Sequence, residues 1–268
     1  MGVTEQEHIH HMRDKMTKHQ IILSSSYSEG TRICMDFTDC DSGMFKSVMD
    51  KVSAAYDGKS VSFSIHTVHT DSAEWESVVE RDPYFRDVRV IRTADEFVKL
   101  IQKDRYLKGI DVARYILSVF KCTHTRIEKL TYMCYADYLC STGERLFDDK
   151  VYAFQYGPVI DSVYKEFKGH SKESPGDAID DRIYSLDLKL QMKSRILFSE
   201  DGDKKLDSIR RTLERYKQIS TSRLVELTHI EGSPWSRVYV KAESSDDSMY
   251  MPIPDQYIRQ YHHVEECS

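Results

Sequence analysis

The sequence of 268 residues contains none of the short motifs that mark the common enzyme classes. It has no Gly-x-Gly-x-x-Gly, no Gly-x-x-x-x-Gly-Lys-Ser/Thr, no Gly-x-Ser-x-Gly and no His-Glu-x-x-His. These absences exclude the usual signatures of dinucleotide-binding, phosphate-binding, esterase and zinc-protease sites. We therefore predict a protein that is not an enzyme and that needs no cofactor.

The chain also lacks paired cysteines and long apolar runs. Its six cysteines include no Cys-x-x-Cys pair, so we expect free thiols in a reducing compartment and no metal site. Nowhere do about 18 apolar residues follow one another, and the polar amino terminus lacks the apolar stretch of a secretory signal. We predict a cytoplasmic protein with no membrane partner.

An excess of basic residues is missing as well. The 38 Lys and Arg residues face 44 Asp and Glu residues, for a net charge of -6, which argues against nucleic acid as a partner. Residues 189–223 are locally basic, and the segment "STSRLVELTH" at residues 220–229 could pass for the second element of a helix-turn-helix. Opposite charges interleave there, so we favour a solvated helix face over a DNA-binding surface.

What is present suggests an α+β protein with two domains. We expect a flexible segment at residues 1–18 and a small α/β accessory domain at 19–106, in which strands and helices alternate. Residues 60–70 have the period-two pattern of a half-buried strand, with Val61, Phe63 and Ile65 on its buried side. His66 and His69 should then lie on opposite faces, and the histidines at 8, 10 and 11 fall in the flexible segment.

Residues 107–268 have the longer apolar periodicity of helices. We expect a helix that starts with Thr125 and Glu128 at capping-box spacing and ends at Gly143. Further helices are expected at 201–217 and 221–229, the second capped by Ser220 or Thr221, and a final short helix should begin near Pro254.

A short aromatic strand, "VYAFQYGPVI", interrupts these helices at residues 151–160. We expect Tyr152, Phe154 and Tyr156 to share one face and to pack against the helix of residues 125–140. Gly157 would let the backbone turn tightly, and Pro158 would open the next helix.

The segment "LTHIEGSPWSRVY" at residues 227–239 contains the most suggestive polar cluster. His229 could act as a base that Glu231 orients beside Ser233, which would make the protein a hydrolase or transferase. The alternative, which we favour, is a histidine near the carbonyls of a helix end, followed by a turn that Trp235 anchors into a loop.

Three segments in this order resemble the Panacea antitoxin domain, also called SocA-like, over residues 109–262. They are a Lys-Leu-x-Tyr helix, an aromatic Gly-Pro-Val corner and a Leu-Thr-His…Pro-Trp segment. The matched residues, which we expect to be scaffold or interface, are Lys129, Leu130, Tyr132, Tyr156, Gly157, Pro158, Val159, Thr228, His229, Pro234 and Trp235.

The resemblance implies a mainly helical domain, with a short β element, that neutralises a cognate toxin by direct binding in a bacterial or prophage toxin–antitoxin system. The toxin would be encoded by the adjacent gene. One branch of the family implies an alternative, an adaptor that delivers the toxin to a cytoplasmic protease. The accessory domain lies outside the resemblance, and contact with the toxin, regulation and self-association are its alternative roles.

Overall fold

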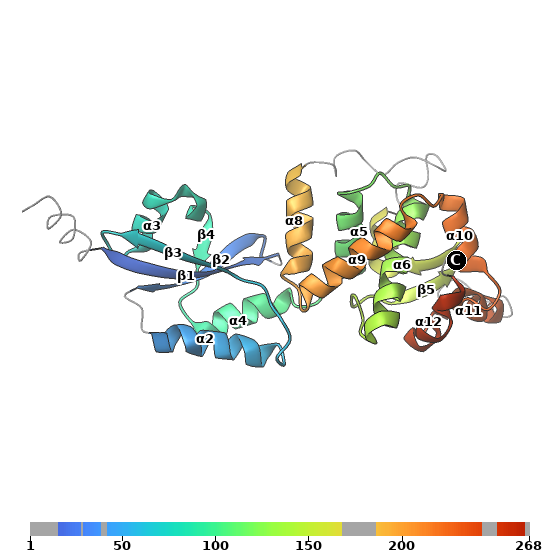
Figure 1. Cartoon of the computed structure of the whole chain (residues 1–268), viewed down its shortest axis with the longest axis horizontal. Helices are drawn as coiled ribbons and strands as arrows, with labels where there is room; N and C mark the ends of the chain where they lie inside the picture. The colour runs from blue at the N-terminus through green and yellow to red at the C-terminus, as the bar shows by residue number, and fades with distance from the viewer. Residues whose placement is uncertain (1–15, 28, 39–41, 168–185, 243–250, 266–268) are drawn as a thin grey trace, which may run out of the picture. The chain divides into compact units, whose positions relative to one another are not determined.

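The structure, a computed structural model, describes residues 16–27, 29–38, 42–167, 186–242 and 251–265 (Figure 1). Internal contacts divide the chain into two compact units. The N-terminal unit comprises Met1–Arg105 with Phe198–Glu200, and the C-terminal unit comprises Tyr106–Leu197 with Asp201–Ser268. The histidines at positions 8, 10 and 11 lie outside the described residues.

The N-terminal unit is built on a four-stranded sheet. Its strands are β1 (Thr17–Ser26), β2 (Thr31–Thr38), β3 (Ser64–Thr70) and β4 (Val88–Val90). They lie in the order β3-β1-β2-β4, and β1 is antiparallel to both of its neighbours while β4 is parallel to β2. Because β1 and β2 occupy the centre, β3 and β4 form the two edges of the sheet.

Helices cover both faces of this sheet (Figure 1). Apolar side chains of α2 (Ser42–Ala55) and α4 (Ala94–Lys103) form a core with Ile22, Ile33 and Met35 on one face. On the other face, α3 (Trp75–Arg81) and the short 3-10 helix η1 (Pro83–Phe85) pack on Ile21 and Cys34. Successive side chains of β1 and β2 therefore point alternately into two separate cores, as a sheet that is covered on both sides requires.

The third strand differs from its prediction. It begins at Ser64 rather than at residue 60, and Ile65 is 55 % exposed, so the expected buried face ends at Phe63. This difference arises because α2 and α4 cover the centre of the sheet and leave the β3 edge open. His66 and His69 do lie on opposite faces: His66 packs edge-on against the ring of Phe85, and His69 is exposed.

The C-terminal unit is organised around one long helix, α6 (His124–Thr142). Twelve of its nineteen residues are buried, and its neighbours contact it from several sides, which is the arrangement of a central helix. The surrounding helices are α5 (Gly109–Leu117), α7 (Asp161–Phe167), α8 (Leu186–Leu197), α9 (Gly202–Tyr216), α10 (Thr221–His229), α11 (Pro234–Ala242) and α12 (Asp255–Tyr261), followed by the 3-10 helix η4 (His262–Val264).

A small antiparallel sheet completes this unit. It consists of β5 (Val151–Phe154), β6 (Gly157–Ile160) and β7 (Met251–Pro252) in the order β6-β5-β7. Pro158 lies inside β6 opposite Ala153, and the following helix starts at Asp161. The predicted role of Pro158 at a helix start is therefore wrong. A proline fits on β6 because this strand is an edge strand and one of its sides carries no ladder hydrogen bonds.

The predicted packing of the aromatic strand is also wrong. Val151 and Ala153 are buried, whereas Tyr152 and Phe154 are only partly buried and Tyr156 is 67 % exposed. Val151 and Ala153 face the core cluster of this unit, whereas the ring of Phe154, on the opposite face of β5, packs against Tyr164 of α7, with the ring centroids 4.9 Å apart.

Several helix boundaries follow local signals and others do not. Gly143 ends α6 with φ +75°, and Ser220 caps α10 by accepting from the backbone N–H of Arg223, as expected. The cap of α6 is Thr123 rather than Thr125. The helix α8 was not predicted, and the turn expected at Ser233–Trp235 leads into a new helix, α11.

These elements confirm the predicted α+β fold class, with a small α/β unit followed by a mainly helical one. Among the described residues, no helix combines the length and the apolar character that a membrane span needs.

Candidate functional site

The turn between β5 and β6 is the point where side chains from three helices meet. The indole Nε1 of Trp235, on α11, donates to the carbonyl of Phe154 at 2.7 Å. The Nζ of Lys129, on α6, donates to the carbonyl of Pro158 at 2.8 Å. The ring of His229, on α10, places Nε2 3.2 Å from the carbonyl of Gln155. We call this arrangement the clamped turn.

Gly157 lies at the centre of the clamped turn, where no side chain would fit. Its φ of +100° is a backbone conformation that residues with a Cβ rarely adopt. A Cβ at this position would lie 2.6 Å from Oγ1 of Thr228 and 3.0 Å from Cε of Lys129. The glycine is therefore required both for the backbone conformation and for the close approach of α6 and α10.

Lys129 is a buried cation with 1 % exposure. Burial lowers its pKa to about 8, against the opposing charges of Glu128 and Glu265. Glu128 is equally buried, and burial raises the pKa of its carboxyl, although Oε2 accepts from the backbone N–H of Ile160 at 3.1 Å. The clamped turn therefore rests on a charged group inside the core, supported by a neighbouring carboxylate.

The remaining polar atoms near the clamped turn are engaged in scaffold contacts. The Oγ of Ser233 donates to the carbonyl of Thr228 at 2.8 Å, and Ser233 is fully buried. His229 Nδ1 lies 2.7 Å from the carbonyl of Val225, and its ring centroid lies 3.9 Å from that of Trp235. Both ring nitrogens thus lie against backbone carbonyls.

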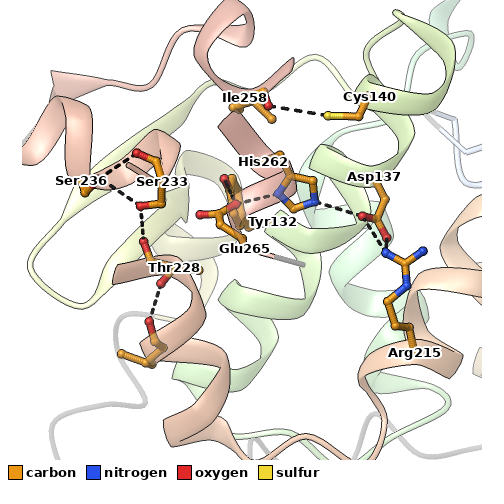
Figure 2. A network of polar contacts seen from close by, with 11 residues as sticks. Tyr132, Asp137, Cys140, Arg215, Thr228, Ser233, Ser236, Ile258, His262 and Glu265 are labelled. Atoms are coloured by element: carbon orange, nitrogen blue, oxygen red, sulfur yellow. Dashed lines mark hydrogen bonds and ion pairs between the residues drawn. The ribbon is translucent and has the colours of Figure 1, made fainter. Parts of the chain in front are cut away.

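The hydrolase hypothesis loses its geometric support from these contacts. Glu231 is exposed, and among the described residues no hydrogen bond joins it or Ser233 to the imidazole of His229. The hydroxyl of Ser233 links the end of α10 to the start of α11, because it also accepts from the backbone N–H of Ser236 at 3.1 Å (Figure 2). A base, a nucleophile and an orienting acid do not converge here.

A second polar network, which the sequence did not reveal, ties the end of the chain to α6. Figure 2 shows Tyr132 and His262 pointing at the same carboxylate oxygen of Glu265, at 2.7 and 2.6 Å. The other nitrogen of His262 lies 3.0 Å from Asp137, which also accepts from Thr212 at 2.6 Å. We call this the C-terminal network. A histidine between two carboxylates that are far apart in sequence leaves no local signal.

The charges in the C-terminal network depend on one another. Burial lowers the pKa of His262, but the hydrogen bonds and charges of Asp137 and Glu265 outweigh it and raise the pKa to about 9. Burial likewise raises the pKa of the Asp137 carboxyl, and the hydrogen bonds from His262 and Thr212 reverse this shift, so that the pKa is lowered. The imidazolium of His262 is thus the form that the folded unit stabilises.

A pH dependence of stability follows from His262. A histidine whose folded pKa is raised from 6.5 to about 9 stabilises the folded state fully below pH 6.5, and the contribution disappears as the pH rises through 9. Between pH 6.5 and 8 we expect His262 to account for a loss of about 2 kcal/mol in the free energy of unfolding. Urea unfolding at the two pH values measures this loss. The His262→Gln variant should not show it, whereas the His263→Gln variant, which replaces the exposed neighbour, should show it in full. An equal pH slope in both variants would contradict the assignment.

The N-terminal unit contains its own buried polar network. His19 lies 2.8 Å from Asp36 through Nδ1 and 3.0 Å from the hydroxyl of Thr70 through Nε2, an order that resembles a catalytic relay. However, Thr70 is buried and donates its hydroxyl to the carbonyl of Ser72 at 2.6 Å. The network therefore joins β1, β2 and the end of β3. Within the described ranges, no group of three His, Cys, Asp or Glu residues is arranged to hold a metal ion.

The matched motif residues differ in exposure, and His229 is partly buried. Most are buried: Lys129, Leu130, Tyr132, Pro158, Val159, Thr228, Pro234 and Trp235 have little or no exposed surface, and Gly157 is enclosed as well. Tyr156 is different because 67 % of it is exposed, directly at the tip of the clamped turn.

Comparison with known proteins agrees with the three-part motif. The family model described as "Antitoxin SocA-like, Panacea domain" matches residues 127–236, which run from α6 through the clamped turn to the start of α11. No curated protein and no solved structure gives a significant match. Residues 127–236 of this chain therefore form a Panacea domain of the antitoxin SocA-like family.

Proposed function

We propose that the protein is an antitoxin that neutralises a cognate toxin by binding it directly, and that the adjacent gene encodes this toxin. The observation that carries the proposal is the antitoxin-family domain at residues 127–236. Neutralisation by binding needs a rigid surface rather than reacting groups, and the contacts of the clamped turn are those of a scaffold.

Separate induction of the two genes tests this function. Expression of the adjacent gene alone should arrest growth, and co-expression of this protein should restore it, with the two proteins eluting as one complex. Growth that does not depend on this protein would refute the proposal. If growth is restored but the half-life of the toxin falls and no complex accumulates, the protein is instead an adaptor for a cytoplasmic protease.

We further propose that Tyr156 is an anchor for the toxin and that the buried motif residues hold it in position. Its backbone neighbours are fixed by hydrogen bonds from Trp235 and His229, so little conformational entropy remains to be lost there on binding. An exposed tyrosine offers a large contact area with few rotatable bonds, and tyrosine is enriched among the residues that dominate binding energy. The toxin should present an apolar pocket that accepts the ring.

Replacement of this side chain should separate binding from folding. We expect Tyr156→Ala to weaken the complex roughly 30-fold, as for an anchor residue worth about 2 kcal/mol, with an unchanged melting temperature. The matched control is Tyr106→Ala, a comparably exposed tyrosine of the same unit, at 53 %. Titration calorimetry with the purified toxin measures both. Equal affinities of the two variants would remove Tyr156 from the interface without affecting the proposed function.

A further inference from the structure

The two edges of the N-terminal sheet are built differently. The β4 edge is only three residues long and carries Arg89, which forms ion pairs with Glu96 at 2.6 Å and Glu29 at 3.7 Å. A short, charged edge strand discourages pairing with another chain. The β4 edge is therefore protected in the way that edges of natural sheets usually are.

The β3 edge has none of these protections. Its seven residues, Ser64–Thr70, include no Lys, Arg, Asp, Glu or Pro. They pair with β1 in seven consecutive steps, so no bulge interrupts the strand. In the part of the chain that the structure describes, β1 is the one strand that pairs with β3. Every second residue of β3 thus directs its backbone N–H and C=O away from the sheet.

The exposed face of β3 points to a partner that is itself a β-strand. Ile65 is 55 % exposed although its cross-strand neighbour Ile22 is completely buried. Thr67 and His69 alternate with the less exposed His66 and Val68, so the strand has the regular pleat that another strand can continue. One added strand would form hydrogen bonds with the outward-facing backbone groups of β3 and would also cover the side chain of Ile65.

We propose that the outer edge of β3 pairs with β3 of a second copy of this chain, so that two four-stranded sheets join into one. A strand without charged side chains can meet its own copy without like-charge repulsion, whereas the β4 edge would bring two copies of Arg89 together. A twofold axis gives the antiparallel arrangement. With Thr67 at the axis all seven residues pair, and Ile65 packs beside His69 of the second copy.

Sedimentation equilibrium of the full chain across a dilution series tests this pairing. We expect the mass to rise with concentration toward that of a dimer. Thr67→Lys and Thr67→Glu each place like charges opposite each other at the axis and should shift the monomer–dimer midpoint roughly 5-fold to higher concentration. An equimolar mixture of the two variants should restore dimers, because Lys then meets Glu. This recovery also shows that both variants are folded.

The control is Thr38→Lys, which introduces the same side chain at an exposed position on β2. It should dimerise like the unmodified chain. A chain that stays monomeric at every concentration would overturn the proposal and leave the edge to a strand of another protein. Dimers that tolerate Thr67→Lys, or a mixture that does not recover, would equally overturn it.

Discussion

Gly157→Val is expected to unfold the C-terminal unit and abolish neutralisation. The β-branched side chain must adopt a φ of +100°, and its Cβ would overlap Oγ1 of Thr228, 2.6 Å away. Backbone strain and overpacking each cost about 1–3 kcal/mol, so we expect a loss of about 3–5 kcal/mol in the free energy of unfolding. Such a loss is comparable with the whole stability of a small domain.

Unfolding of the C-terminal unit can be followed by itself. The chain has two tryptophans, so Trp235 reports on the clamped turn alone once Trp75 is replaced by Phe. The matched control is Gly143→Val, whose backbone also has a positive φ but where no atom lies within 4 Å of a Cβ. In this control the free energy of unfolding should fall only by the cost of the backbone strain. Equal losses in the two variants would contradict the steric argument, and a folded Gly157→Val protein that fails to bind would place the turn in the interface.

Lys129→Met is expected to lower the free energy of unfolding by about 3–5 kcal/mol, which is the usual effect of removing one partner of a buried ion pair. Methionine has a similar length but cannot donate to the carbonyl of Pro158, and it removes the positive charge that interacts with the carboxylates of Glu128 and Glu265. Urea unfolding followed by Trp235 fluorescence measures the loss, and Lys165→Met, on an exposed lysine, is the control.

A second substitution separates charge from packing at this position. In Lys129→Met/Glu128→Gln the uncompensated carboxylate is removed, while Gln can still accept from the backbone of Ile160. We expect the double variant to be more stable than Lys129→Met alone. If Lys129→Met stayed within about 1 kcal/mol of the unmodified protein, packing of the lysine stem rather than its charge would hold the turn.

Local signals predicted much of the fold. Gly143 and Ser220 end and begin helices as their chemistry requires, and the alternation of strands and helices marked the N-terminal unit. The face of β5 could not be predicted, because its small residues Val151 and Ala153 are buried and its larger aromatic residues are not. Side-chain size suggested the opposite orientation, and the face that meets the core is instead set by tertiary contacts such as that of Phe154 with Tyr164.

The candidate site was predicted in its parts but not in its geometry. The motif identified Lys129, Gly157 and His229, yet no local pattern indicates that a lysine in the middle of a helix is buried. Its burial depends on a carbonyl 29 residues further along the chain. The C-terminal network was missed for the same reason, because His262 and Asp137 are 125 residues apart.

The clamped turn also sets an order of events during synthesis. His229 and Trp235 hold carbonyls of residues that precede them by 74 and 81 positions, so β5 and β6 leave the ribosome well before these two of the three clamping side chains are made. At roughly 5–20 residues per second the interval is on the order of 10 s. During that interval the nascent chain cannot hold Tyr156 in its final position. If Tyr156 anchors the toxin as proposed, we expect competence to bind to arise late in translation and to be absent from a chain released before α11 is complete.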